Sequence, residues 1–302
     1  MIDSPTSTSI ASLVALRRKA MTMRLLSGSI CAPLAGGHSS RLRGRGMEFD
    51  EVRRYQPGDD AATIDWKVTA RKGVPHTKLF HEERERPVLL CIDYRQAMFF
   101  ATRGVLKAVL ASRLSALYGW SAINHSDRVG ALLFDDTRVW EQRPARGRRA
   151  LLHLFYRCCN HPNWDYPLAP VASPLQFKQV LLHLRRVAHS GSLVVLVTDG
   201  RGLDQGAEAA LAAVAQHNTM ILILISDPIE RNLPSGGNYP IHDGNGLVVI
   251  NGDDAKLRQR YAQQFSDRYE AVRQISRRRG IHLLEISTDD DPFDLLATPN
   301  AR

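Results

Sequence analysis

The sequence predicts a doubly wound α/β fold with a mostly parallel sheet, preceded by a small β subdomain. From residue 88 onward, short apolar runs such as "VLLCID", "SLVVLVTDG" and "MILILISD" alternate with longer segments of helical periodicity. Parallel strands are covered on both faces, so they are continuously apolar and do not alternate with polar residues. Residues 47–87 contain short alternating pieces instead, which is typical of a small β unit.

We expect three regions along the chain. Residues 1–46 form an N-terminal helix and a linker, residues 47–87 the β subdomain, and residues 88–302 the α/β domain. The helix is expected over residues 10–29, before a stretch rich in Gly, Ser and Arg. Its apolar residues that share one face are Leu13, Leu16, Met23 and Leu26.

The β subdomain is expected to hold two strands, "FDEVRRY" and "HTKLFHEE". They are joined through the turn "QPGDD" and the segment "IDWKVTARKG", with Gly58 at the position of the turn that needs a positive φ.

The α/β domain is expected to alternate strands and helices to its end. Strands are predicted at 88–93, 128–136, 138–143, 192–200, 220–227 and 281–287, and helices at 104–123, 147–159, 174–189, 205–217, 253–279 and 292–296. The strand at 138–143 pairs with the one before it. Residues 228–252 are Pro- and Gly-rich with little periodicity, so we expect an irregular excursion there.

Acidic residues follow several of the predicted strands. They are Asp93, Asp135 or Asp136, Asp199 and Asp227. Ligands of doubly wound folds bind at the carboxyl ends of the strands, so these acids are candidates for one functional rim. The alternative is structural, because Asp after a strand commonly caps the next helix.

The bulk composition bears on partners and location. The net charge is +9 and the isoelectric point about 9.6, which favours acidic partners or simply reflects a surface with dispersed arginines. The four cysteines show no CxxC pair, so we expect reduced thiols in a cytoplasmic protein. The N-terminus lacks a signal-peptide pattern, and no apolar run is long enough for a membrane helix.

An enzymatic interpretation starts from "PGDDAATIDWK". Asp60, Asp65 and Lys67 are similar to the carboxylates and lysine of Mg²⁺-dependent nucleases. Only a few residues separate the two halves, too few for the hairpin that normally brings such groups together. A third interpretation, suggested by the basic charge, is a non-catalytic binder of nucleic acid or anionic membranes.

Residues 44–84 carry a dense set of motif positions. The pattern is G-x-G-x-E-F, R-x-Y-x-P-G-D-D, I-D-W, A-R and E-E-R before an apolar strand. Its residues are Gly44, Gly46, Glu48, Phe49, Arg53, Tyr55, Pro57, Gly58, Asp59, Asp60, Ile64, Asp65, Trp66, Ala70, Arg71, Glu82, Glu83 and Arg84. This stretch resembles the signature of the bacterial family called domain of unknown function 58. The region after it resembles the von Willebrand factor A-like part of that family, and the likeness covers roughly residues 30–230.

The resemblance implies a non-enzymatic adaptor or assembly protein without a cofactor or small-molecule substrate. Its implied partners are a MoxR-type AAA+ ATPase and other von Willebrand A-domain proteins, and nucleic acid is not expected. The implied location is the cytoplasm, with peripheral attachment to the inner membrane through partners as an option.

Von Willebrand A domains bind Mg²⁺ at a metal-ion-dependent adhesion site through D-x-S-x-S, a threonine and a later aspartate. This chain keeps Asp93 and, in "VTDG", Asp199, but Arg95 and Ala97 occupy the two serine positions. Ser173 is the candidate for the threonine. Two oxygen ligands are lost and a permanent cation is added, so we expect a degenerate, metal-free site. Arg95 is expected to pair with Asp93 and Asp199; the alternative is that Arg95 points into solvent.

The signature segment has two possible roles. Its charged residues either fold the small subdomain internally or form a surface that docks a partner. The docking candidates are Arg53, Tyr55, Asp59, Asp60, Asp65, Trp66 and Arg71, together with Arg95 from the strand-end rim. Exposure of Trp66 and Arg71, the residue types of interface hot spots, would favour docking.

Overall fold

The computed structural model describes residues 4–22, 47–56, 58–82, 86–165, 171, 173–242 and 247–297. The chain forms two compact units. Met1–Cys31 and Arg86–Arg302 make the larger one, and Ala32–Glu85 make the smaller one.

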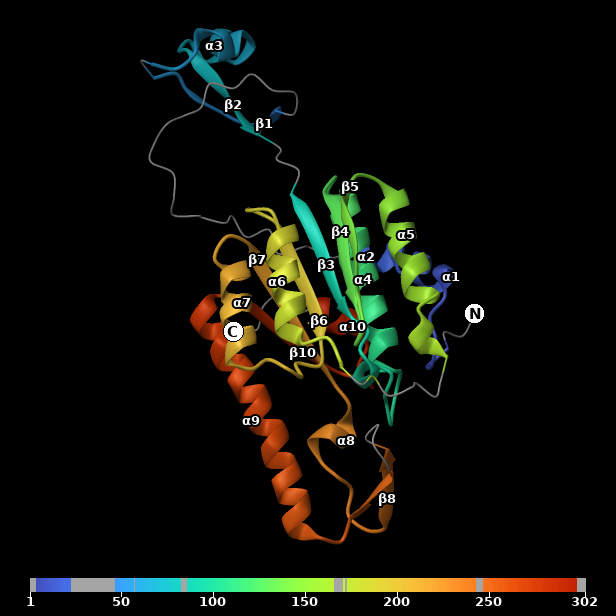
Figure 1. The fold of residues 1–302 in the computed structure, drawn as a ribbon. Helices are drawn as coiled ribbons and strands as arrows, with labels where there is room; N and C mark the ends of the chain where they lie inside the picture. The colour runs from blue at the N-terminus through green and yellow to red at the C-terminus, as the bar shows by residue number, and fades with distance from the viewer. Residues whose placement is uncertain are drawn as a thin grey trace. The chain divides into compact units, whose positions relative to one another are not determined.

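A six-stranded sheet in the order β10-β7-β6-β3-β4-β5 forms the centre of the larger unit (Figure 1). Its strands are β3 (Pro87–Asp93), β4 (Arg128–Phe134), β5 (Val139–Ala145), β6 (Leu193–Thr198), β7 (Thr219–Ser226) and β10 (His282–Ser287). All neighbours are parallel except β4 and β5, which pair antiparallel. The predicted doubly wound, mostly parallel α/β fold is therefore confirmed.

Helices cover both faces of this sheet (Figure 1). They are α4 (Lys107–Asn124), α5 (Arg148–Cys159), α6 (Phe177–Val187), α7 (Gln205–Ala215), α9 (Ala255–Arg279) and α10 (Pro292–Ala297), with short 3₁₀ turns at Gln96–Met98 and Pro162–Trp164. In β3, Val88, Leu90 and Ile92 pack with α4 and α5, whereas Leu89 and Cys91 pack with α6 and α7. Burial on both faces explains why the strand sequences are continuously apolar.

The N-terminal segment packs onto the α/β unit. It forms two short helices, α1 (Ile10–Ala15) and α2 (Arg17–Ala20), and the remainder of the helix expected over 10–29 lies outside the described residues. Leu13 is fully buried in the core. The Trp120 indole Nε1 in α4 donates to the Leu13 carbonyl oxygen at 2.9 Å. The segment is therefore an integral part of the α/β core.

Residues 228–252, expected to be irregular, contain regular structure. A short helix, α8 (Pro228–Arg231), precedes an antiparallel hairpin of β8 (Asn238–His242) and β9 (Leu247–Asn251). Among the described residues, these two strands form a separate two-stranded sheet. They were not predicted because Pro240 and the flanking glycines are residue types that disfavour strands. The expectation of an irregular excursion was wrong for these three elements.

The smaller unit contains two antiparallel strands and one helix. The strands are β1 (Met47–Arg54) and β2 (His76–Glu82), and a 3₁₀ turn at Ala61–Thr63 precedes α3 (Trp66–Lys72). The strands match the prediction, and Gly58 has a φ of +109°, as the predicted turn requires. The helix was not predicted. Asp65 caps its first turn and Gly73 ends it with a φ of 69°, so local capping residues define it.

None of the helices in the described part of the chain has both the length and the apolar character that crossing a bilayer requires.

Candidate functional site

The site lies where β3 and β6 run side by side in the sheet. The helices that follow these two strands cover opposite faces, because α4 packs in one core cluster and α7 in the other. Such a topological switch point is where doubly wound folds bind ligands. Asp93 ends β3, Thr198 ends β6, and Asp199 follows directly. The fold thus brings the two predicted acids to one place.

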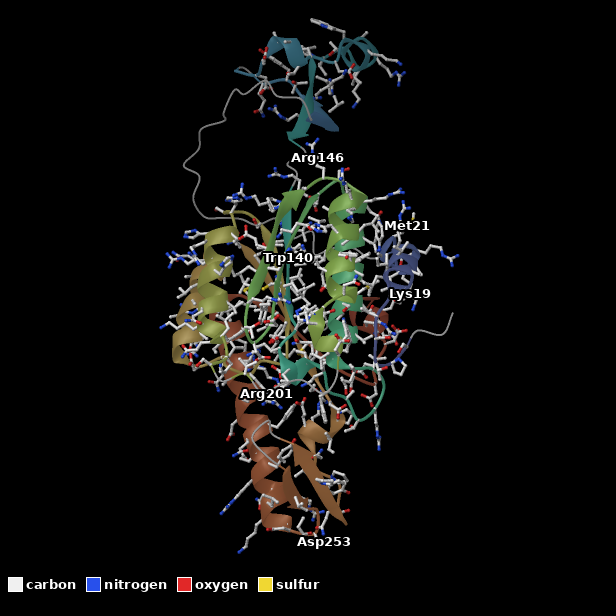
Figure 2. The ribbon with its side chains drawn as sticks, turned by 45° about the vertical axis from the view of Figure 1, so that its right-hand side comes forward. Lys19, Met21, Trp140, Arg146, Arg201 and Asp253 are labelled. Carbon is white, nitrogen blue, oxygen red and sulfur yellow. The ribbon has the colours of Figure 1, made fainter. Side chains whose placement is uncertain are left out.

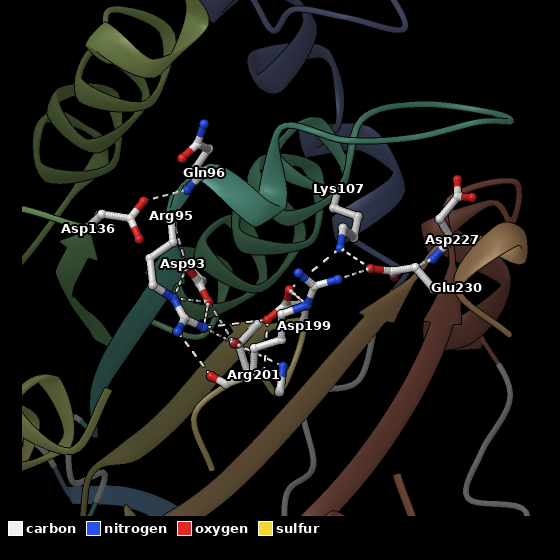
Figure 3. Close-up of polar contacts among 11 residues, drawn as sticks. Asp93, Arg95, Gln96, Lys107, Asp136, Asp199, Arg201, Asp227 and Glu230 are labelled. Atoms are coloured by element: carbon white, nitrogen blue, oxygen red, sulfur yellow. Dashed lines mark hydrogen bonds and ion pairs between the residues drawn. The ribbon is translucent and has the colours of Figure 1, made fainter. Parts of the chain in front are cut away.

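The guanidinium of Arg95 fills the space between these acids (Figure 3). Its Nη2 donates to Asp93 Oδ2 at 2.6 Å, and its Nε donates to Asp93 Oδ1 at 3.0 Å. Nη2 also donates to Asp199 Oδ1 at 3.4 Å, and Nη1 donates to the Arg201 carbonyl at 3.0 Å. The Arg95 side chain is only 12% exposed. The expected pairing is present, and the alternative in which Arg95 points into solvent is wrong.

Two aromatic rings support the guanidinium. The Arg95 Cζ lies 4.8 Å from the Phe177 ring centroid and 5.8 Å from that of Phe134. Both rings are buried. Because a guanidinium is weakly hydrated and planar, it tolerates an apolar surface on one side while its edge donates to carboxylates. Arg95 is therefore fixed by packing as well as by charge.

A hydroxyl that sequence reasoning missed completes the contacts of Asp93. Thr198 Oγ1 donates to Asp93 Oδ2 at 2.7 Å and accepts from the Gly200 backbone N–H at 3.2 Å. Ser173, the residue expected to supply a hydroxyl, is exposed. The sequence held a signal for this hydroxyl, since Thr198 is the last residue of β6 and directly precedes Asp199 in "VTDG".

The electrostatics of the pair favour the charged forms. Burial alone would lower the pKa of the Arg95 guanidinium, but Asp93 and Asp199 outweigh burial and the net shift of this pKa is upward. Burial alone would raise the pKa of Asp199, but Lys107, Arg95 and Arg201 outweigh it and the net shift of this pKa is downward. The ion pairs therefore hold both groups ionised.

A second group of charges extends the site toward α8 (Figure 3). Lys107, the first residue of α4, is fully buried, with Nζ 2.9 Å from Glu230 Oε1 and 3.5 Å from Asp199 Oδ2. Arg201 Nη2 donates to the same Glu230 oxygen at 2.9 Å, and its Nε lies 3.3 Å from Asp199 Oδ2. Neither residue was predicted to belong to the site. Lys107 lies in a predicted helix, and Glu230 lies in the segment that was expected to be irregular.

These contacts form a charge-balanced network of three carboxylates and three cations. Its members are Asp93, Asp199, Glu230, Arg95, Lys107 and Arg201. We call it the switch-point network.

A Mg²⁺ ion does not fit the residues of the switch point. Both oxygens of Asp93 accept hydrogen bonds from Arg95, and Thr198 donates to one of them. A divalent cation is bound by several neutral or anionic oxygens. In this chain, Arg95 and Ala97 occupy the two positions that hold serines in the D-x-S-x-S motif. A fixed guanidinium beside a divalent ion would repel it strongly in a buried site. No group of three potential metal-ligating side chains occurs within the described ranges.

The other acids at the strand ends serve local structure. Asp135 accepts from the backbone N–H groups of Thr137 and Arg138, and its Oδ2 lies 3.2 Å from His161 Nε2. Asp136 Oδ2 accepts from the Gln96 N–H at 2.6 Å. Asp227 caps α8. The capping alternative therefore describes Asp227, whereas Asp135 holds the turn between β4 and β5 and caps no helix.

In the smaller unit, several signature residues form hydrogen bonds within the unit. Arg53 Nη2 donates to Asp59 Oδ1 at 2.8 Å, and the Tyr55 hydroxyl donates to the Asp59 carbonyl at 3.2 Å. The hydrogen bond from Arg53 lowers the pKa of the Asp59 carboxyl. Asp60 accepts from the Ala62 N–H, which starts the 3₁₀ turn. These four side chains hold the fold of the unit, while Pro57, Gly44, Gly46, Glu83 and Arg84 lie outside the described residues.

Other signature residues face solvent, among them two of the interface hot-spot types. The Trp66 side chain is 71% exposed, and Arg71 in the same helix is exposed. By the criterion of exposure, these two positions favour docking.

The nuclease arrangement has no counterpart in this geometry. Asp65 accepts from the N–H groups of Lys67 and Val68, and its other oxygen lies 3.5 Å from Lys78 Nζ. Asp60 caps a different turn. The two carboxylates therefore cap separate elements, and Lys67 is exposed to solvent.

The molecule is a doubly wound α/β protein that also carries a small signature unit. Its switch-point carboxylates hold a guanidinium between them. The chain belongs to the family described as "Protein of unknown function DUF58", whose model matches residues 51–271. This confirms the predicted resemblance.

Relatives of similar length are known from mycobacteria. The chain is 30% identical over 262 residues to the uncharacterized proteins Mb1516 of Mycobacterium bovis and Rv1480 of Mycobacterium tuberculosis, covering 85% of this chain and 80% of each relative. Among solved structures, it is similar to an aerotolerance-related membrane protein from Bacteroides fragilis, with 14% identity and a TM-score of 0.42. That match covers 69% of this chain and 94% of the other.

Proposed function

We propose that this protein is a non-enzymatic adaptor that binds a MoxR-type AAA+ ATPase. The observation that carries the proposal is the Arg95 guanidinium, which lies 2.6 Å from Asp93, at the position where the resemblance to von Willebrand A domains implies a metal ion. A carboxylate site closed by a protein cation offers no open coordination position to a substrate. What remains is a rigid, charge-balanced rim suited to protein contact.

The second contact region is the smaller unit. Its internal ion pairs and caps fix the backbone, and Trp66 and Arg71 stay exposed. Preorganised exposed Trp and Arg side chains are the residue types that dominate protein interfaces. A basic chain with a net charge of +9 would meet an acidic ATPase surface, so binding should weaken with salt.

Direct binding tests the proposal. The full chain is immobilised and titrated with the MoxR-type ATPase of the same organism, without nucleotide, with ADP and with ATP. We expect saturable binding that depends on the nucleotide and weakens as salt rises. Absence of binding in every nucleotide state at tens of micromolar ATPase would reject the proposal.

The rim itself is tested with a matched pair of bulky substitutions. Gln96 is exposed next to Arg95, and Gln216 is exposed at the end of α7. Gln96→Trp is expected to weaken ATPase binding, because it places a large side chain on the rim. Gln216→Trp is the control and should bind like the parent chain. Equal binding by both variants would remove the rim from the interface.

The absence of catalysis is a separate expectation. The acids of the nuclease-like segment cap backbone turns, so we expect no nicking of plasmid DNA with Mg²⁺. Nicking that Lys67→Ala abolishes would contradict the non-enzymatic proposal.

A further inference from the structure

The helix α3 of the smaller unit presents an unusual exposed face. Trp66, Lys67, Ala70 and Arg71 are exposed and lie within one half of the helix circumference. We call these four residues the α3 face. Val68 and Thr69 are half-buried on the other side of the helix, and Lys72 lies on that side too, exposed at the last helical position. The largest apolar side chain of the helix therefore points into solvent and not into the unit.

The α3 face is held rigidly. Asp65 accepts hydrogen bonds from two N–H groups in the first turn at 3.0 and 3.1 Å. Gly73 ends the helix, and Thr69 Oγ1 accepts from the His76 N–H of β2 at 3.0 Å. A short helix that is fixed at both ends loses little further freedom on binding, which is the condition for an efficient binding surface.

The charge of the α3 face has one sign. The segment "WKVTARKGV", residues 66–74, has three cations and no acidic residue. Elsewhere in the unit, Arg53 pairs with Asp59 and Lys78 pairs with Asp65. An exposed indole with two cations on the same face of the helix and a third at its end is complementary to an apolar pocket with acidic residues around it.

We infer that the α3 face inserts Trp66 into an apolar pocket on the partner ATPase, with Asp or Glu residues of that pocket facing Lys67 and Arg71. This inference rests on the proposed function and names the contact that carries it. A protein pocket fits better than nucleic acid, because three cations on a helix of about 10 Å cover only a few phosphates. It fits better than a bilayer, because a single indole is a small apolar anchor.

The experiment measures the dissociation constant for the MoxR-type ATPase at three salt concentrations. Trp66→Ala is expected to weaken binding roughly 30-fold, and Trp66→Tyr to recover much of the loss, because removal of an interface hot spot costs a factor of this size. The triple variant Lys67→Glu, Arg71→Glu, Lys72→Glu is expected to weaken binding at low salt more than 10-fold and to flatten the salt dependence.

Matched controls separate a local contact from a general effect. Tyr156 in α5 is 53% exposed, and Tyr156→Ala is the aromatic control. Arg148, Arg149 and Arg185 are exposed, and their triple replacement by Glu changes the net charge by the same amount as the α3 variant. Figure 2 shows that Arg146, next to the first two, lies well away from Arg201 of the switch-point network within the α/β unit. Circular dichroism confirms that each variant is folded.

A photo-crosslinking amino acid in place of Ala70 gives an independent readout and is expected to join the chain to the ATPase. Equal binding by the parent and the α3 variants, or equal loss in the charge control, would overturn the inference and leave the proposed function standing. No binding by the parent chain would overturn both. Binding of a DNA oligomer or of anionic vesicles that is lost with Trp66→Ala, without binding to the ATPase, would reassign the α3 face to that ligand.

Discussion

Lys107 and Glu230 are 123 positions apart in the chain, yet Lys107 Nζ lies 2.9 Å from Glu230 Oε1 in a buried ion pair. Lys107 begins α4 on one side of the sheet, and Glu230 belongs to α8 after β7. The pair ties the first crossover of the domain to the segment that leads into the β8–β9 hairpin. Asp199 and Arg201 share this contact, so the switch-point network is continuous across three loops.

Removing the lysine from this pair should be costly. Lys107→Met removes a fully buried cation and leaves Glu230 paired with the half-exposed Arg201, so we expect the free energy of unfolding to fall by about 3 kcal/mol. Glu230→Gln in the same background should restore part of the loss, because it removes one of the carboxylates that lost the lysine. Urea unfolding of both single variants and the double variant measures the coupling. Additive effects would show that the two residues do not interact.

Arg95 can be replaced by the serine pattern of a metal site. The variant Arg95→Ser with Ala97→Ser removes the guanidinium and supplies two hydroxyl oxygens beside Asp93 and Asp199. Without metal, this variant should be less stable than the parent by about 3 to 5 kcal/mol, because buried carboxylates lose their cation. Millimolar Mg²⁺ should raise its melting temperature and leave that of the parent unchanged.

Calorimetry with Mg²⁺ and Mn²⁺ checks the parent chain directly. Adding Asp93→Asn to the serine variant is the control and should abolish its response to Mg²⁺. Micromolar metal binding by the parent chain that Asp93→Ala removes would refute the assignment of Arg95 as the resident cation.

The N-terminal segment should contribute to the stability of the α/β unit. Leu13 is fully buried, so Leu13→Ala is expected to reduce the free energy of unfolding by about 2 to 5 kcal/mol. Ile10, in the same helix but 38% exposed, is the matched control, and Ile10→Ala should change the stability by less than about 0.5 kcal/mol. Chemical denaturation measures both variants. An equal effect would mean that the segment does not pack as a fixed part of the core.

The sheet could be predicted because its physical signal is local. Each parallel strand is a continuous apolar run, and each covering helix repeats its apolar residues every three or four positions. The β8–β9 hairpin lacks such a signal, since its strands are short and Pro240 interrupts one of them. Helix α3 was not predicted for another reason: three of its seven residues, Trp66, Val68 and Thr69, are aromatic or β-branched, and its cap residues mark it only at the ends.

The site was predictable only in part. Asp93 and Asp199 lie at the ends of apolar runs, and the resemblance to von Willebrand A domains implied one site with Arg95 at a ligand position, so the pairing could be predicted from sequence. Thr198, Lys107 and Glu230 reach the site through tertiary contacts between segments far apart in the chain. No local pattern distinguishes a lysine at the start of a buried helix from a solvated one.

The pH dependence of stability should reflect the network. The folded pKa of Asp199 lies below its ordinary value of 3.8, because the neighbouring cations outweigh burial. Below pH 4 the unfolded chain therefore binds more protons at this position than the folded chain does. Stability rises with pH wherever this holds, so the contribution of Asp199 is complete above pH 4 and is lost as pH falls through its folded pKa.

Two amide substitutions separate this effect from general acid denaturation. Asp199→Asn should be less stable at neutral pH, and its unfolding free energy should fall less steeply than that of the parent below pH 4. Asp136 is a contrast, because burial raises its pKa and its charged form opposes folding at neutral pH. Asp136→Asn retains an oxygen that can accept from the Gln96 N–H, and it should therefore steepen the acid limb. Urea midpoints from pH 2.5 to pH 7 measure all three chains. If the unfolding free energies of Asp199→Asn and of the parent fell equally steeply below pH 4, the lowered pKa of Asp199 would be contradicted. Equal slopes would mean that folding does not change how many protons the Asp199 carboxylate binds.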